Sequence, residues 1–403
     1  MVAYGDFVAL SQSGDSEERG QAAHLAAQAY LQHTGPADEH AALYAALIGF
    51  LDDPSVRVRA ALAYGLLHTT DAPRPILLAL LQDSEVISRA VVQYSPALID
   101  ADLIGFVRHA SLVLLQAVAL RQTISARLAE ALIARSQRQV TLKLLQRGAE
   151  VPVPQHLLAQ LSELHGARDA EIRGALLDRT DLPAATRLHL VEAAVAALRG
   201  ARIVRGAIAA PRLARMVRDA MDTALTTIGE REAVAGPTPF ASDLVAAERV
   251  SARVMLHAVV NGHVLFFAEC LSALAEVPRD KVFTLLEAGS RQALNALLAR
   301  CGMRPAVCNL IARLIFHARA ADLADDITAR HFVVTALTEE LIVEHDGVIP
   351  PELEDAFAYL SEQNVALARR AARGVMSSFA GDLNAARAMP VVGPEDRLAL
   401  PAA

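Results

Sequence analysis

Aromatic residues are scarce in this chain of 403 residues: they make up 4%, and tryptophan is absent. Hydrophobic residues nevertheless make up 53%, so the core volume must come from leucine, valine, isoleucine and alanine. Alanine and leucine lose little side-chain freedom in a helix. The composition therefore predicts closely packed helices rather than sheets, and it contains too much apolar material for a disordered chain.

Cysteine and lysine are also rare. The three cysteines form no CxxC pair and are too few for a disulfide framework, which fits a reducing compartment. The first ten residues, MVAYGDFVAL, show no signal-peptide pattern, so we expect a cytoplasmic protein. Lysine occurs only at Lys143 and Lys281, so arginine supplies almost all positive charge. The net charge of -7 argues against non-specific nucleic-acid binding, which needs a positive field.

Sequence motifs of catalysis are missing. The chain contains no GxSxG, HExxH, GxGxxG or GxxxxGK[ST]. Asp322, Asp325 and Asp326 form an acidic cluster, but the position of Asp326 before Ile327 and Thr328 is more simply a helix start. We therefore predict that the protein is not an enzyme, with no catalytic residue and no cofactor.

Histidine and cysteine lie near each other in two segments, but at the wrong spacing for zinc. Zinc sites prefer close pairs such as C-x₂₋₄-C and H-x₃₋₅-H, and the gaps here are six, seven, seven and nine positions. Cysteine is commonly buried as a small hydrophobic residue. We therefore predict no metal site. The residues concerned are His257, His263, Cys270, Cys301, Cys308 and His317.

One apolar stretch, residues 254–274, resembles a membrane span in its composition. It contains His257, His263 and Glu269, and an Asn261-Gly262 pair that breaks helices. A span needs about 20 mostly apolar residues with few charges. We therefore predict two buried helices joined at Asn-Gly and no transmembrane segment.

Internal repetition is the most informative feature of the chain. Several segments share one layout: an apolar helix, a short break, then a second apolar helix. One such hairpin cannot bury its apolar face alone, so neighbouring hairpins must stack. The sequence thus predicts an all-α superhelical array of short antiparallel helix pairs. The breaks lie near Pro73, Ile99, Ile124, Val153 and Leu182, and again at Pro278 and Pro305.

Two kinds of known repeat resemble these segments. Residues 53–66, DPSVRVRAALAYGL, resemble the second helix of a HEAT repeat, and Asp181-Leu182-Pro183 resembles a leucine-rich-variant unit. Together with the block at 271–303, the succession over roughly residues 40–320 is similar to a family of alphaproteobacterial proteins known as a domain of unknown function with HEAT-like repeats. The resemblance implies an all-helical fold in a bacterial cytoplasm, and it implies no reaction.

Breaks in the pattern divide the chain into five regions. The segment GEREAVAGPTPFASD carries glycine and proline breakers and little apolar periodicity, which favours a linker or exposed loop. The expected regions are a HEAT-like array at 1–228, this linker at 229–243, further helical repeats at 244–320, C-terminal helices at 321–389 and a disordered tail at 390–403.

A run of arginines is the strongest candidate binding surface. Its members recur mostly every three residues, so a continuous helix would carry them as one basic stripe, although Pro211 can break that helix. Guanidinium groups bind acidic proteins, anionic lipids or phosphates. The alternative is a solvated face paired with Glu192, Asp219 and Asp222. The arginines are Arg199, Arg202, Arg205, Arg212, Arg215 and Arg218.

Helical arrays present long surfaces to protein partners, so we expect a non-catalytic scaffold or regulator that binds an unidentified protein. The alternative is a HEAT-like nucleic-acid-binding protein or DNA-base-processing enzyme. Against it stand the negative charge and the few aromatics available to stack on a base. The segment NVALARRAARGVM, residues 364–376, also suggests a homodimer seam.

Overall fold

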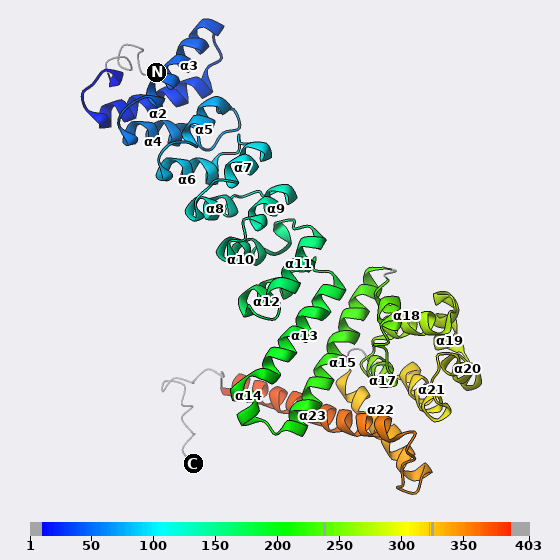
Figure 1. The fold of residues 1–403 in the computed structure, drawn as a ribbon. Helices are drawn as coiled ribbons and strands as arrows, with labels where there is room; N and C mark the ends of the chain where they lie inside the picture. Colours follow the sequence, from blue (N-terminus) through cyan, green and yellow to red (C-terminus); the bar gives the residue numbers. More distant parts are fainter. Residues whose placement is uncertain (1–9, 237–238, 322, 324–325, 388–403) are drawn as a thin grey trace, which may run out of the picture. The chain divides into compact units, whose positions relative to one another are not determined.

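A computed structural model describes residues 10–236, 239–321, 323 and 326–387. These residues form 22 α-helices and one 3₁₀ helix, and the described part of the chain contains no strand, which confirms the all-α prediction. The helices group into two compact units, Met1–Gly200 (unit 1) and Ala201–Ala403 (unit 2). Figure 1 shows the helices of each unit.

Unit 1 consists of short helices that pack in two rows. In one row α2, α4, α6, α8 and α10 each contact the next even-numbered helix, so that the row ends at α12. In the other row α3 contacts α5, α7 contacts α9 and α11 contacts α13. Consecutive hairpins therefore cover each other's apolar faces. The helices are α2 (Ser16–Gln32), α3 (Ala37–Leu51), α4 (Val56–Leu66), α5 (Arg74–Leu80), α6 (Glu85–Tyr94), α7 (Asp100–Val107), α8 (Leu112–Ala119), α9 (Ala126–Ala134), α10 (Arg138–Gln146), the 3₁₀ helix η1 (Gly148–Glu150), α11 (Gln155–His165), α12 (Ala170–Leu177) and α13 (Ala184–Gly200).

Most of the predicted breaks lie where helices begin. Pro73 and Ile99 are the N-cap residues of α5 and α7, and Ile124 precedes Ser125, whose hydroxyl accepts a hydrogen bond from the backbone N–H of Leu128 at the start of α9. The Ser125 hydroxyl thereby satisfies an N–H group that has no partner within the helix.

Arginines join successive helix pairs of unit 1. Arg121, just after α8, donates to the carbonyls of Val92 and Ser95 at the end of α6. Arg147, just after α10, donates to the carbonyls of Ala119, at the end of α8, and of Arg121. The last carbonyls of a helix lack partners within it, and the planar guanidinium fork can bind two of them at once. The arginine content of the chain thus has a structural use within unit 1.

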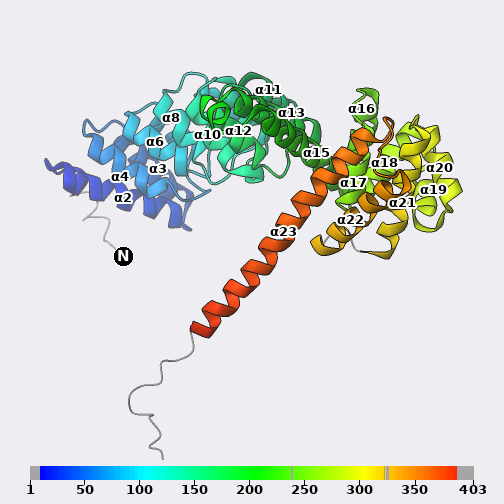
Figure 2. The same ribbon diagram turned by 90° about the horizontal axis from the view of Figure 1, so that it is seen from below.

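Unit 2 is arranged around α18, which contacts α15, α16, α17, α19 and α20. Figure 2 shows α23 as one uninterrupted helix that begins among the other helices of unit 2 and extends beyond them. The helices are α14 (Arg202–Ala207), α15 (Ala210–Ala235), α16 (Phe240–Ala246), α17 (Ala252–Val260), α18 (Val264–Ala275), α19 (Arg279–Ala288), α20 (Arg291–Arg300), α21 (Pro305–Ala320), α22 (Ile327–Glu344) and α23 (Glu354–Arg387).

Residues 254–274 form parts of α17 and α18, which meet at Asn261-Gly262, so the prediction of two buried helices is confirmed. Gly262 has a φ of +74°, a conformation that glycine adopts without strain. Among the described residues, no helix is long and apolar enough to cross a membrane.

The expected linker at 229–243 is largely helical. Residues 229–235 complete α15 and residues 240–243 begin α16, while 237–238 lie outside the described residues. Helical spacing places Leu225, Ile228 and Ala233 in the interior, a periodicity that the nearby glycine and prolines concealed. The compact units also divide between Gly200 and Ala201 rather than near residue 228.

Two contacts hold this end of α15 against α18. The carboxylate of Glu230 accepts hydrogen bonds from the backbone N–H groups of Leu265 and Phe266 in the first turn of α18. Gly229 faces the ring of Phe266 so closely that an added Cβ would lie 2.1 Å from a ring carbon. A glycine at this point of α15 therefore serves packing and not a turn.

Near the start of α22, Asp326 is the N-cap residue and accepts a hydrogen bond from the backbone N–H of Thr328, as the sequence suggested. Asp322, Asp325 and the tail expected at 390–403 lie outside the described residues.

Candidate functional site

The six arginines of the predicted stripe are all exposed, but they do not lie on one continuous helix. Ala201 separates α13 from α14, and Ile208 and Ala209 separate α14 from α15. Ile208 has extended backbone angles, with φ -125° and ψ 126°, so the helical phase is lost there. The arginines divide among three helices: Arg199 in α13, Arg202 and Arg205 in α14, and Arg212, Arg215 and Arg218 in α15.

Two of them line a groove between α15 and α23, an open space of about 730 Å³. Arg212, Arg215 and Met216 come from α15, and Val365 and Arg369 come from α23. We call this space the α15/α23 groove. It combines three guanidinium groups with apolar side chains, a pairing that the sequence did not reveal because Arg369 is 154 positions from Arg215.

The carboxylates of the groove already have partners on its inner side. The side-chain amide of Gln363 donates to Asp219, with 2.6 Å between nitrogen and oxygen. Glu362 lies 3.4 Å from the guanidinium of Arg253. The same guanidinium lies 2.7 Å from Asp222. Asp219 and Asp222, which we considered as partners of the arginine stripe, are thus engaged with Gln363 and Arg253.

The arginines of the groove have no such partner. Within the part of the chain that the structure describes, Arg212, Arg215 and Arg369 form no ion pair. The lining thus holds three guanidinium groups without ion-pair partners and two carboxylates, Asp219 and Glu362. The cations outnumber the anions, which favours an anionic ligand.

The two helices that line the groove also share a buried hydrogen-bond network centred on His257 of α17. Its Nδ1 atom lies 3.1 Å from the hydroxyl of Tyr359 in α23, and its Nε2 atom lies 3.2 Å from the hydroxyl of Thr223 in α15. The guanidinium of Arg253 lies over the Tyr359 ring, 4.9 Å from its centroid. Three helices that also form or support the groove are therefore joined by polar contacts.

Burial keeps His257 and Tyr359 neutral. It lowers the pKa of His257 to about 4, and the side chain is only 2% exposed. Burial likewise raises the pKa of Tyr359 well above its usual value. A neutral imidazole has one donor and one acceptor nitrogen, so one hydroxyl donates to the ring and the other accepts from it. The arrangement orders three helices and positions the groove.

The cysteines carry no thiolate at neutral pH. Burial raises the pKa of Cys270 and Cys308, and it raises the pKa of Cys301 to about 11. Among the described residues, no three histidine, cysteine or acidic side chains lie close enough to hold a metal ion.

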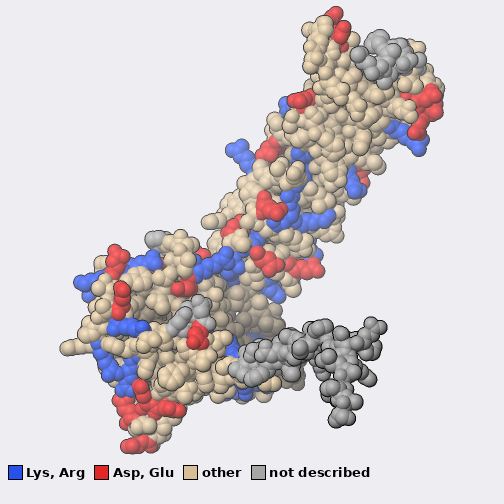
Figure 3. Space-filling model, turned by 180° about the vertical axis from the view of Figure 1, so that it is seen from behind, with Lys and Arg blue, Asp and Glu red and all other residues tan. Residues whose placement is uncertain are grey.

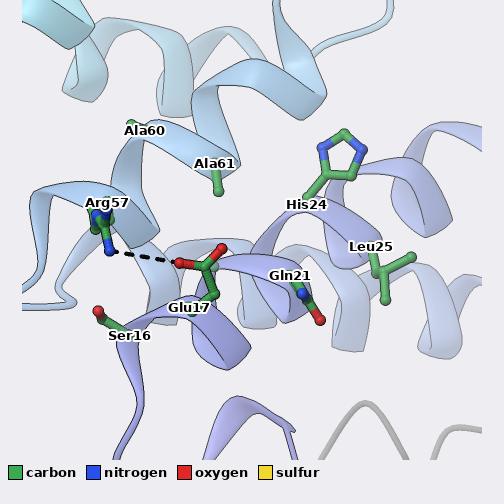
Figure 4. A pocket seen from close by; sticks show the side chains of 9 residues that line it. Ser16, Glu17, Gln21, His24, Leu25, Arg57, Ala60 and Ala61 are labelled. Atoms are coloured by element: carbon green, nitrogen blue, oxygen red, sulfur yellow. Dashed lines mark ion pairs between the residues drawn. The ribbon is translucent and has the colours of Figure 1, made fainter.

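A second pocket, of about 660 Å³, lies on α2 and α4 in unit 1 (Figure 4). The small residues Gly20, Ala60 and Ala61 are part of its lining. Glu17 and Arg57 lie at one end of the pocket, 3.5 Å apart, and both are largely exposed. Exposed pairs of this kind contribute little, about 0–1 kcal/mol, so the pocket is weakly defined as a binding site.

These features define the class of the protein: an all-helical chain of two compact units with an exposed basic groove in the second. The chain belongs to DUF2336, a family described as uncharacterised proteins conserved in bacteria, whose family model matches residues 87–346. The match covers more than half of the chain and includes parts of both units. No curated protein and no solved structure matches the chain.

Proposed function

We propose that this protein is a non-catalytic scaffold or regulator that binds a protein partner in the bacterial cytoplasm. In this proposal unit 1 is a HEAT-like α-solenoid. The contacts between alternate helices in two rows, and the arginines that join successive repeats, support that assignment. Stacked helix pairs of this kind offer long surfaces whose affinity is distributed over many residues.

The observation that carries the proposal is the α15/α23 groove. Its arginines lie beside Met216 and Val365, which are 49% and 53% exposed. Arginine and methionine are enriched in protein interfaces, and charged groups around apolar contacts set orientation and association rate. The buried network centred on His257 fixes the helices that carry these side chains, so little order must be gained on binding.

Three other arginines of the run lie in the same unit as the groove. Arg202, Arg205 and Arg218 are exposed, and we propose that they add positive charge for an anionic partner. They lie outside the groove lining, so their contribution is through the electrostatic field and the association rate. Arg199 is also exposed but belongs to unit 1, so we propose it as a separate contact with such a partner.

Charge reversal tests the proposal. We expect that replacing Arg202, Arg205, Arg212 and Arg215 with glutamate abolishes capture of the partner from native cell extract without lowering the melting temperature. The matched control reverses four exposed arginines elsewhere and changes the net charge equally. These are Arg89, Arg127, Arg168 and Arg291. Capture that survives the first set, or is lost equally with the control set, contradicts the proposal.

The same proteins test the nucleic-acid alternative. A nucleic-acid-binding protein loses affinity steeply as salt rises, because binding releases counterions. We expect no binding to duplex DNA at about 150 mM salt, and a salt-dependent mobility shift at that concentration would favour the alternative.

A further inference from the structure

Unit 2 also carries an acidic surface where α22 turns into α23. Exposed carboxylates gather there, and Figure 3 shows acidic side chains concentrated at this end of the unit. Four of them define the surface, and within the described residues none of these four carboxylates forms an ion pair. We call this surface the acidic corner, and its carboxylates are Asp346, Glu352, Glu354 and Asp355.

Exposed apolar side chains accompany these carboxylates. Val343, at the end of α22, and Val348, in the turn, are each 77% exposed. When a partner covers a valine that is this exposed, the burial of its apolar surface favours binding. The acidic corner therefore combines negative charge with uncovered apolar surface.

The α15/α23 groove has the complementary composition. It presents Arg212, Arg215 and Arg369 without ion-pair partners, together with the partly exposed Met216 and Val365. The two surfaces are complementary in net charge, because carboxylates predominate at the corner and guanidinium groups outnumber the two carboxylates, Asp219 and Glu362, in the groove. Both surfaces also carry exposed apolar side chains that could cover each other. Carboxylates and guanidinium groups form strong charge-assisted hydrogen bonds.

The two surfaces cannot meet within one molecule. Glu354 begins α23, and Arg369 lies on the same uninterrupted helix. With a rise of about 1.5 Å per residue, that helix holds the two side chains roughly 22 Å apart. Only another molecule can bring an acidic corner into this groove.

We propose that the acidic corner of one copy of this chain docks into the α15/α23 groove of a second copy. The inference rests on the proposed role of the groove arginines and names their anionic partner. The contact is heterologous, because two different surfaces meet, so its repetition forms a ring or a filament rather than a two-fold dimer. It differs from the seam suggested by residues 364–376, which would pair like with like.

Charge-swap complementation tests this contact with the full chain. The groove variant carries Arg212→Glu and Arg215→Glu, and the corner variant carries Asp346→Lys and Glu354→Lys. Sedimentation velocity at about 50 mM salt measures assembly, and circular dichroism checks that each variant is folded. We expect wild-type protein to assemble with concentration, and each variant alone to associate at least about ten-fold more weakly, because like charges then meet.

An equimolar mixture of the variants provides the decisive result. In the mixture the reversed groove meets the reversed corner, and the native groove meets the native corner, so every contact is again complementary. We expect assembly to return to near the wild-type level and to weaken as salt rises. Any of three results overturns the inference. The wild-type chain stays monomeric at 200 µM (on the order of ten-fold above a weak Kd). One variant assembles without the other, or the equimolar mixture does not assemble. If extract capture still depends on the arginines, the proposed function stands without it.

Discussion

The hydroxyl of Tyr359 lies 3.1 Å from Nδ1 of His257, a residue 102 positions earlier in the chain. Both side chains are buried, and the contact joins α17 to α23, the helix that forms one wall of the groove that we propose as a binding surface. A buried polar pair of this kind is stable only when every group is satisfied. The loss of one hydrogen-bonding atom from this network should therefore disturb the helices that form the groove.

Removing the Tyr359 hydroxyl tests this relationship. Tyr359→Phe leaves a nitrogen of His257 without its partner in a site that water does not reach, and we expect the free energy of unfolding to fall by about 1–3 kcal/mol. Urea unfolding measures the change. The control is Tyr64→Phe, because Tyr64 is exposed on α4 and should tolerate the loss. Equal effects of the two substitutions would refute a role for the buried contact.

Acid should destabilise unit 2 through His257. Its pKa is about 4 in the folded chain and about 6.5 in the unfolded chain, so the unfolded chain binds more protons between these pH values. Neutral His257 therefore makes its full contribution to the free energy of unfolding above pH 6.5 (about the ordinary pKa of histidine). That contribution is lost as the pH falls toward 4. The loss is on the order of 3 kcal/mol.

The pH prediction requires a comparison with His257→Gln, because other groups also titrate in this range. Glutamine keeps a donor and an acceptor but does not gain a proton. We expect the free energy of unfolding of the variant to fall less between pH 7 and pH 4 than that of the wild-type chain. Parallel curves for the two proteins would show that His257 does not dominate the acid response.

The arginines between repeats should matter for folding. Arg179 is fully buried, and it donates to the carbonyl of Val151 and pairs with Asp181 at 2.7 Å. Arg179→Met leaves that carbonyl and carboxylate without a partner, so we expect a loss of about 2–3 kcal/mol in the free energy of unfolding. Arg89→Met on the exposed face of α6 is the control, with an expected change within about 0.5 kcal/mol. A stable Arg179 variant would show that the inter-repeat contacts are incidental.

The close approach of α15 and α18 can be tested with one methyl group. Gly229→Ala places a Cβ 2.1 Å from the Phe266 ring, which cannot move away because it is fully buried. We expect overpacking to lower the free energy of unfolding by about 1–3 kcal/mol. Gly206→Ala in α14 meets no atom within 4 Å and should be neutral or slightly stabilising. A neutral Gly229 variant would contradict the tight contact of the two helices.

The all-α class and the repeated breaks were predictable because they depend on local sequence. Pro73 and Ile99 mark helix starts that are visible without knowledge of any distant residue. Apolar periodicity failed at 229–235, since Gly229 and the breakers after it hid a helix whose buried face includes Leu225 and Ile228. A glycine that allows a close approach cannot be told from a turn glycine until its neighbour is known.

The groove was only half predictable. The spacing of Arg212 and Arg215 identified one wall, because residues three apart on a helix share a face. The other wall includes Arg369, and only the tertiary fold brings it to α15. The alternative of a solvated face counted Asp222 among the counter-ions of the arginine run, whereas the fold pairs Asp222 with Arg253.

Site-specific photocrosslinking in living cells tests the central claim most directly. A photoreactive amino acid at Met216, inside the α15/α23 groove, should form a covalent adduct with the bound protein, and the mass of the adduct identifies it as a second copy or another chain. The same probe at Val234, exposed on α15 but outside the groove lining, should form none. An adduct at position 216 alone is the result we predict. Equal adducts at both positions, or none at position 216, would contradict a binding role for the groove.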